Sequence, residues 1–190
     1  MSPTLCPDGL RFFEERLKLC RCFVEYGCGG TTLYAANHAK VPAVFSVDTD
    51  ANWISKVSTN LSSDVNISLA HVDLGPVGDW GVPASTIHYN RFWEYPTIPW
   101  TQCWASGAVP DTILIDGRFR VACFLYTLLK SRIGSHILFD DYFTRPEYFV
   151  AERFSPVRYK QGRMAVFVAD REFNIGELVA EFGKHLSDLR

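Results

Sequence analysis

The sequence has no long hydrophobic run and no cluster of basic residues. Its apolar stretches fall well short of the ~18 consecutive residues that a membrane-spanning helix requires, so we expect no membrane association. The net charge is −2, and without a basic stripe the chain lacks the electrostatic footprint of a nucleic-acid-binding protein. No apolar core follows a basic segment near the first residues, which argues against a secretory signal and favours a cytoplasmic protein.

The six cysteines form neither a disulfide framework nor a metal site in the sequence pattern. No two of them have the C-x-x-C spacing. A metal site built from Cys20, Cys22 and Cys28 would lack a fourth ligand at a suitable spacing. We expect free thiols, mostly buried, in a reducing compartment.

Short apolar runs and amphipathic helical patterns alternate along the 190 residues, of which 47% are hydrophobic. No repeat, linker or composition break divides the chain, so a single domain over residues 1–190 is expected. The runs expected as strands are 22–26, 43–48, 65–73, 112–116 and 135–141. Helical patterns are expected at 10–20, 31–40, 51–61, 121–129 and 175–186. This alternation indicates an α/β fold with a parallel sheet and helices on both faces.

The last part of the chain follows a different pattern. The segments 154–160 and 163–169 flank Gln161-Gly162, a two-residue turn typical of an antiparallel hairpin. Asn174 and Glu177 are placed like the capping box of the final helix. The expected sheet therefore has seven strands, mostly parallel, with an antiparallel C-terminal hairpin.

Residues 74–111 do not fit this alternation. The segment holds four of the five tryptophans and five of the ten prolines. A loop of this length in a compact domain is usually functional or ordered by its own packing. Two interpretations stay open: an extended surface loop held by its aromatic side chains, or a lid or wall of a substrate pocket.

The first expected strand runs directly into a glycine turn, Gly27-Cys28-Gly29-Gly30. In an open α/β sheet, ligands bind at the carboxyl ends of the strands where the strand order reverses, and glycines there let the backbone approach the ligand. Asp48 lies nineteen residues after Gly29, at the end of the second strand. Its carboxylate can accept hydrogen bonds from ribose hydroxyls there. The pattern predicts a site for an adenosine-containing cofactor.

Three details distinguish between the adenosine cofactors. No Gly-Lys-Ser/Thr follows the turn, which excludes a phosphate-binding P-loop. Thr32 occupies the position at which a dinucleotide fingerprint has glycine or alanine. Glu25 would repel a pyrophosphate, whereas a carboxylate suits a cofactor that carries an amine and a sulfonium. An oxidoreductase that uses a nicotinamide cofactor is therefore the less favoured alternative.

The sequence VEYGCGG resembles motif I, acid-x-Gly-x-Gly, of the class I S-adenosylmethionine-dependent methyltransferases. Asp48 in SVDTD and Asp73 in AHVD resemble that family's acids after the second and third strands. More narrowly, EYGCGGTT, VDLGPVGDWG, LIDGRFRVAC and LFDDYFTRPEY are similar to small methyltransferase-like proteins without an assigned substrate. The resemblance covers roughly residues 20–170. It implies a Rossmann-like fold and methyl transfer from S-adenosylmethionine.

The resemblance also implies roles for individual residues. Gly27 and Gly29 would lie under the methionine end of the cofactor, with Glu25 near its amine. Asp48 would hold the ribose, and Asp73 would flank the adenine. The residues expected at the cofactor are Glu25, Gly27, Gly29, Thr31, Asp48 and Asp73. Each of the carboxylates has a plain structural alternative as a helix cap or a solvated turn residue.

The catalytic groups are expected at the ends of the fourth and fifth strands. Methyl transfer mainly requires alignment of the acceptor and exclusion of water, and a base only where the acceptor must lose a proton. Asp116 and Asp141 close these strands and are the candidates. They could also hold a divalent cation through oxygen ligands. The Asp-x-His arrangement of catechol-type O-methyltransferases is absent, so no metal is assigned.

Three arginines, Arg118, Arg120 and Arg145, follow the same strand ends. They either recognise a carboxylate or phosphate on the substrate or lie exposed or bridge the sheet. The favoured function is methyl transfer to a small-molecule acceptor. A non-catalytic member that binds S-adenosylmethionine, or has lost it, stays open because no motif after the fourth strand is diagnostic and fold alone does not establish activity. The oligomeric state is not predicted.

Overall fold

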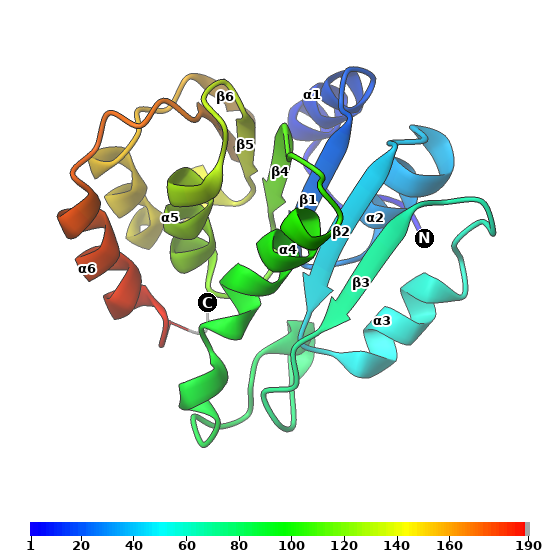
Figure 1. Cartoon of the computed structure of the whole chain (residues 1–190), viewed down its shortest axis with the longest axis horizontal. Helices are drawn as coiled ribbons and strands as arrows, with labels where there is room; N and C mark the ends of the chain where they lie inside the picture. The colour runs from blue at the N-terminus through cyan, green and yellow to red at the C-terminus, as the bar shows by residue number, and fades with distance from the viewer. Residues whose placement is uncertain (189–190) are drawn as a thin grey trace.

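Seven strands form one sheet between two layers of helices in the computed structural model, which describes residues 1–188 (Figure 1). The strands are β1 (Cys22–Tyr26), β2 (Ala43–Asp48), β3 (Ile67–His71), β4 (Thr112–Ile115), β5 (His136–Phe139), β6 (Tyr159–Gln161) and β7 (Met164–Val168). Their order across the sheet is β3-β2-β1-β4-β5-β7-β6. Strands β1 to β5 pair in parallel, and β7 runs antiparallel to both β5 and β6.

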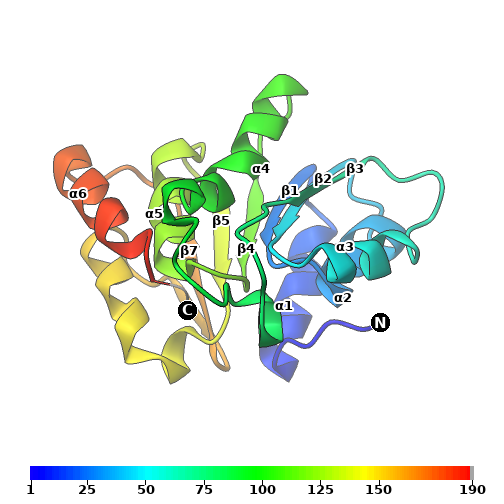
Figure 2. The same cartoon turned by 90° about the horizontal axis from the view of Figure 1, so that it is seen from below.

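The helices divide between the two faces of the sheet (Figure 2). One layer contains α1 (Pro7–Leu17), α2 (Gly30–Leu33) and α3 (Ala51–Ser58). The other contains α4 (Glu94–Ala105), α5 (Arg120–Lys130) and α6 (Ile175–His185). A short π-helix, Tyr34–His38, continues α2. Within residues 1–188 no helix combines the length and the apolar character needed to cross a membrane.

Alternate side chains of each central strand enter opposite cores. In β4, Ile113 and Ile115 belong to the core under α4 and α5, whereas Leu114 belongs to the core under α1. Both faces of these strands are covered, which explains why the strands appear in the sequence as nearly continuous apolar runs. By the same alternation, Glu25 shares the α1–α3 face with Phe23.

The expected fold class is confirmed, and several local predictions hold. The strands at 22–26 and 43–48 have the predicted bounds. The helix expected at 51–61 is present as α3, and Asp50 caps it, since its carboxylate accepts hydrogen bonds from the backbone N–H groups of Asn52 and Trp53. Asn174 caps α6 by accepting from the N–H of Glu177. All six cysteines are free.

The expectation of an extended loop is wrong for residues 94–105, which form α4. Two parallel strands, β3 and β4, need a crossover connection, and a helix is the usual solution. Pro96 lies in the first turn of α4, where a missing N–H costs little. Pro99 lies inside the helix. These prolines and the apolar residues all round concealed the helix in the sequence.

The hairpin turn is shifted by one residue from the prediction. Gln161 pairs with Met164 at the end of β6, so Gly162 and Arg163 form the two-residue turn. Gly162 has a φ of 61°, a conformation that favours glycine at this position. The shift places Arg163 at the turn, close to the carboxyl end of β5.

Candidate functional site

The glycine turn after β1 lies where the strand order reverses, between β1 and β4. Gly27 has a φ of 92°, and a Cβ atom at this position would lie 2.7 Å from Cα of Gly117. A Cβ atom at Gly117 would in turn lie 2.7 Å from the backbone nitrogen of Gly27 and would meet the hydroxyl of Tyr95. The two turns therefore touch through their backbones, and both positions require glycine.

Asp48, at the end of β2, is hydrogen-bonded to this turn. The N–H of Cys28 donates to Oδ2 of Asp48 at 3.1 Å. The N–H groups of Thr49 and Asp50 donate to Oδ1 at 2.7 and 3.1 Å. Burial raises the pKa of Asp48, and these backbone bonds oppose the rise. The thiol of Cys28 also lowers the pKa of Asp48 as a hydrogen-bond donor.

A short 3-10 turn, η2 (Asp79–Gly81), covers the outer side of Asp48. The hydroxyl of Thr49 donates to the carbonyl of Gly81 at 2.5 Å. A Cβ atom at Gly81, where φ is 70°, would lie 3.3 Å from Oδ1 of Asp48. Trp80 has a φ of 60° and is 88% exposed. This part of the 74–111 segment therefore bounds the position of Asp48.

Glu25 lies behind the glycine turn and is fully buried. Its Oε2 accepts hydrogen bonds from the hydroxyls of Thr32 at 2.5 Å and Ser46 at 2.9 Å. The Thr32 hydroxyl oxygen also accepts from the N–H of Gly29 at 2.7 Å. Burial raises the pKa of Glu25 to about 7, although hydrogen bonds from Thr31, Thr32 and Ser46 lower it. The Glu25 carboxylate thus fixes the turn through Thr32.

The two remaining residues expected at the cofactor lie on either side of this centre. Thr31 is buried in α2, directly after the glycine turn. Asp73 is exposed after β3, and its Oδ1 accepts a hydrogen bond from the N–H of Gly75 at 3.0 Å. This backbone bond lowers the pKa of Asp73. Asp73 therefore has the geometry of a solvated turn residue at the edge of the site.

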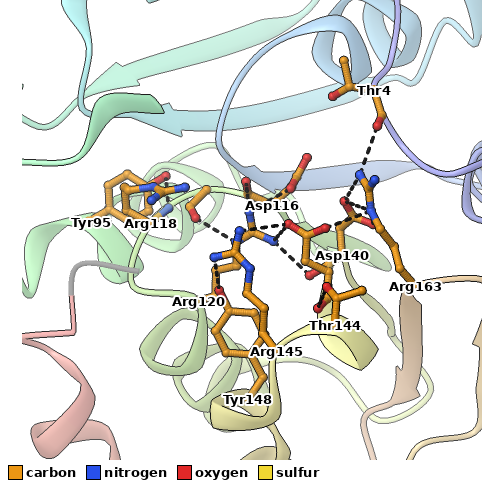
Figure 3. Close-up of polar contacts among 12 residues, drawn as sticks. Thr4, Tyr95, Asp116, Arg118, Arg120, Asp140, Thr144, Arg145, Tyr148 and Arg163 are labelled. Carbon is orange, nitrogen blue, oxygen red and sulfur yellow. Dashed lines mark hydrogen bonds and ion pairs between the residues drawn. The ribbon is translucent and has the colours of Figure 1, made fainter. Parts of the chain in front are cut away.

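Three aspartates gather at the carboxyl ends of β4 and β5, and Figure 3 labels two of them, Asp116 and Asp140. Asp116, Asp140 and Asp141 each have a carboxylate oxygen within 4.8 Å of the others. Asp140 is fully buried, and Nη2 of Arg163 lies 2.7 Å from its Oδ2. Asp141 forms ion pairs at 3.3, 3.4 and 2.9 Å with Arg120, Arg145 and Arg163. The prediction that these strand ends bring Asp116 and Asp141 together agrees with this geometry.

Arg120 joins the ends of β4 and β5. Its side chain is 4% exposed, and Nη2 lies 3.1 Å from Oδ1 of Asp116. Its guanidinium also donates to the carbonyls of Gly117, Asp140 and Asp116, at 2.9, 2.9 and 3.0 Å. A buried guanidinium with this many acceptors is stably paired. Arg120 is therefore a bridging arginine rather than a free recognition group.

Asp116 is a carboxyl group whose pKa lies well above its ordinary value. Burial raises its pKa to about 6, the Arg120 and Arg163 cations lower it, and Asp140 and Asp141 raise it. A carboxylate with this pKa is mostly ionised at neutral pH and lies close to the range of an effective general base. Its side chain is 23% exposed, so solvent reaches it.

The charge balance of the cluster argues against a divalent cation. Three arginines already neutralise the three carboxylates. A cation such as Mg²⁺ requires oxygen ligands that are free to coordinate it, and it would be repelled by the guanidinium groups. The donor set therefore fits an ion-pair network better than a metal site.

Tyr95 and Arg163 belong to the site although the sequence did not single them out. The Tyr95 hydroxyl accepts from the N–H of Arg118 at 3.3 Å and donates to the carbonyl of Val47 at 3.5 Å. It comes from α4, the helix hidden in the 74–111 segment. Arg163 comes from the hairpin turn, and its Nη2 also donates to the carbonyl of Thr4 at 3.1 Å. Neither residue had a periodic or motif signal.

Solved structures share this architecture. A methyltransferase-like protein from Silicibacter pomeroyi is 27% identical to the chain, with a TM-score of 0.84 over 98% of this chain and 97% of its own. A proposed caffeoyl-CoA O-methyltransferase from Staphylococcus aureus is 10% identical, with a TM-score of 0.58 over 89% of this chain and 86% of its own. No family model and no curated protein matches the chain.

A third similar structure, ribosomal protein L11 methylase from Lactobacillus delbrueckii subsp. bulgaricus, is 12% identical, with a TM-score of 0.51 over 87% of this chain and 77% of its own. At this identity the likeness concerns the fold alone. The chain has the Rossmann-like fold of class I S-adenosylmethionine-dependent methyltransferases. Its expected resemblance to methyltransferase-like proteins without an assigned substrate is confirmed.

Proposed function

We propose that this chain transfers a methyl group from S-adenosylmethionine to a small-molecule acceptor. The observation that carries the proposal is the joint position of the Gly27 turn and Asp48, hydrogen-bonded to each other where the strand order reverses. Ligands of open α/β sheets bind at this point. The 27% identity to a methyltransferase-like protein over nearly the whole of both chains supports the same class of reaction.

The residues of the turn fit the chemistry of this cofactor. Gly27 and Gly29 leave the backbone open to the methionine end, and the carboxylate of Asp48 suits a ribose hydroxyl. Asp73 would flank the adenine at the edge of β3, and Thr31 would line the start of α2. Glu25 would act through Thr32, which holds the N–H of Gly29 in place. The nearby carboxylates also favour a ligand with cationic groups.

S-adenosylmethionine supplies an electrophilic methyl group on a sulfonium. The chain would have to align the acceptor with this group and keep water away. Asp116, with its raised pKa, would orient the acceptor or accept its proton. Asp141 forms ion pairs with three arginines, so its proposed role is to hold these arginines beside Asp116. The segment around η2 would bound the cofactor on the side of Asp48.

A second candidate is a non-catalytic protein with this fold. It is favoured by the contact between η2 and the pair Asp48 and Thr49, where the Thr49 hydroxyl already binds the Gly81 carbonyl. If that contact is permanent, the outer side of Asp48 is closed to a ligand. A nicotinamide-dependent oxidoreductase is less favoured, because the buried Glu25 lies beneath the turn at which a pyrophosphate would bind.

Isothermal titration with S-adenosylmethionine, S-adenosylhomocysteine and NAD tests the proposal. We expect micromolar binding of the first two, and about tenfold weaker binding by Asp48→Asn, since a ribose hydroxyl loses a charged acceptor. Asp64→Asn, an identical change at an exposed aspartate, should leave the affinity unchanged. Binding of NAD alone would contradict the proposal, and absence of all binding would favour the non-catalytic candidate.

A further inference from the structure

We propose that Arg118 binds a carboxylate or phosphate group of the small molecule that occupies this site. This proposal rests on the proposed function only for where the small molecule binds. That Arg118 binds an anion is inferred from the surroundings of Arg118 itself. Arg118 is the second residue after Asp116, at the junction of the Gly117 and Gly27 turns. An anion held there would lie beside the reacting groups, so Arg118 would contribute to substrate specificity.

The turn that carries Arg118 is fixed on both sides. Gly117 has no room for a side chain. Phe119 has a φ of 52°, which is costly for an aromatic residue. Its ring is fully buried and packs against Phe92 and Tyr95, with ring centroids 5.2 and 5.5 Å apart. Backbone strain persists where the surrounding structure enforces it, and it is frequent at ligand sites. Arg118 is therefore held in a defined position.

The Arg118 side chain lacks the partners that the other arginines of the site have. Its Nε atom is buried, and within residues 1–188 it has no hydrogen-bond partner. Burial lowers the pKa of Arg118, and the cations of Arg120 and Arg145 lower it further. Figure 3 shows Arg118 beside Tyr95, apart from the aspartates.

The charged Arg118 side chain destabilises the folded chain unless a ligand supplies the missing hydrogen-bond acceptors. A partly buried guanidinium without an acidic partner loses hydration without gaining an ion pair. Guanidinium groups bind carboxylates and phosphates through two parallel N–H···O bonds. A small anion is therefore the ligand that complements Arg118.

Either of two molecules can supply the anionic group that binds Arg118. The methyl acceptor can carry a carboxylate or phosphate, and S-adenosylmethionine carries the carboxylate of its methionine part. The contact between Gly27 and Gly117 brings Arg118 close to the turn proposed for that methionine part. The experiment therefore needs one arm that detects the anion and one that identifies the molecule to which it belongs.

The first arm uses inorganic phosphate and acetate with the whole chain at constant ionic strength. We expect a saturable shift of the Arg118 Nε–H signal in nitrogen-15 NMR and a rise in melting temperature. The rise should disappear in Arg118→Gln and persist in Arg132→Gln, an exposed arginine before β5. Arg118→Gln alone should melt at the same or a higher temperature, because it removes an unpaired charge. Equal stabilisation of both variants, or no shift of the signal, would overturn the proposal.

The second arm compares S-adenosylmethionine with 5′-methylthioadenosine, which lacks the amino-acid carboxylate. If Arg118 binds the cofactor, Arg118→Gln weakens S-adenosylmethionine about tenfold and leaves methylthioadenosine unchanged. If it binds the acceptor, both affinities are unchanged, and phosphate still shifts the Arg118 signal when S-adenosylhomocysteine is bound. If phosphate no longer shifts the Arg118 signal and both affinities are unchanged, then neither the cofactor nor the acceptor supplies the anion, which would contradict the proposal. The first arm needs no cofactor, so failure of the proposed function leaves it interpretable.

Discussion

Glu25 is a fully buried carboxylate whose Oε2 accepts hydrogen bonds from the hydroxyls of Thr32 and Ser46, and the Thr31 hydroxyl also lowers its pKa. Its pKa rises from an ordinary value of 4.5 to about 7, mainly because burial disfavours the charged form. Between these two pH values the folded chain keeps a proton that the unfolded chain releases. The stability contributed by Glu25 is therefore fully present below about pH 4.5 and is lost as the pH rises to about 7.

We expect Glu25→Gln to be more stable than the original chain at pH 8, by up to about 3 kcal/mol, because the amide never has to ionise. At pH 4.5 the two proteins should differ little, since Gln can accept the hydroxyl bonds of Thr32 and Ser46. Urea denaturation at both pH values measures the effect. Glu15→Gln, at an exposed position of α1, is the matched control. A difference between Glu25→Gln and the original chain that does not change with pH would contradict this account.

The positions of single residues were predictable to different degrees. Asp48 lies where a carboxylate at the end of a parallel strand must lie, at the carboxyl edge of the sheet. The face of the sheet on which Glu25 lies could be predicted from the alternation of side chains along β1, since Glu25 lies on the same face as Phe23. Its donors Thr32 and Ser46 come from two other elements, and their convergence depends on the register between β1 and β2. The sequence of a single strand does not reveal its register with a neighbouring strand.

At the scale of elements, the site depends on two turns that pack without side chains between them. The turn after β1 and the turn after β4 meet at Gly27 and Gly117. Gly27 combines a positive φ with a crowded position, and Gly134 has nearly the same φ, 89°, with nothing within 4 Å of an added Cβ. The chain therefore contains its own control, which separates backbone strain from steric crowding.

We expect Gly134→Ala to cost about 1 kcal/mol, the strain of alanine in a left-handed conformation. Gly27→Ala should cost about 3 kcal/mol, because a collision with the backbone of Gly117 adds to that strain. It should also weaken S-adenosylmethionine binding, which Gly134→Ala should leave intact. Urea denaturation and isothermal titration measure the two effects. Equal losses of stability in the two variants would show that the contact between the turns is not tight.

The helix α4 shows what the sequence pattern could not reveal. Central strands were predictable because their apolar runs end at glycine, proline or a cap. In α4, Tyr95, Pro96, Trp100 and Cys103 are all buried, and two prolines interrupt the expected helical composition. The requirement for a crossover between the parallel strands β3 and β4 was the usable signal. It would have placed a helix in the segment.

At the scale of the whole molecule, the sheet order assembles the site from distant parts of the chain. The carboxyl ends of β1, β2, β4 and β5 meet at one edge, which is why Gly27, Asp48, Asp116 and Asp141 could be grouped from the sequence. The arginine pairing was not predictable. Arg163 reaches Asp140 and Asp141 from the antiparallel hairpin, and a one-residue shift of that turn would direct it elsewhere.

The central claim is that S-adenosylmethionine binds at this edge of the sheet. An NMR titration of the nitrogen-15-labelled chain with S-adenosylhomocysteine tests it most directly. We expect saturable shifts of the backbone amides at Gly27–Gly30 and Asp48–Asp50, which include the three N–H groups bonded to the Asp48 carboxylate, those of Cys28, Thr49 and Asp50. Shifts confined to the cavity of about 410 Å³ beside Asn66–Ser68 and Gln102, or no shifts at all, would contradict it.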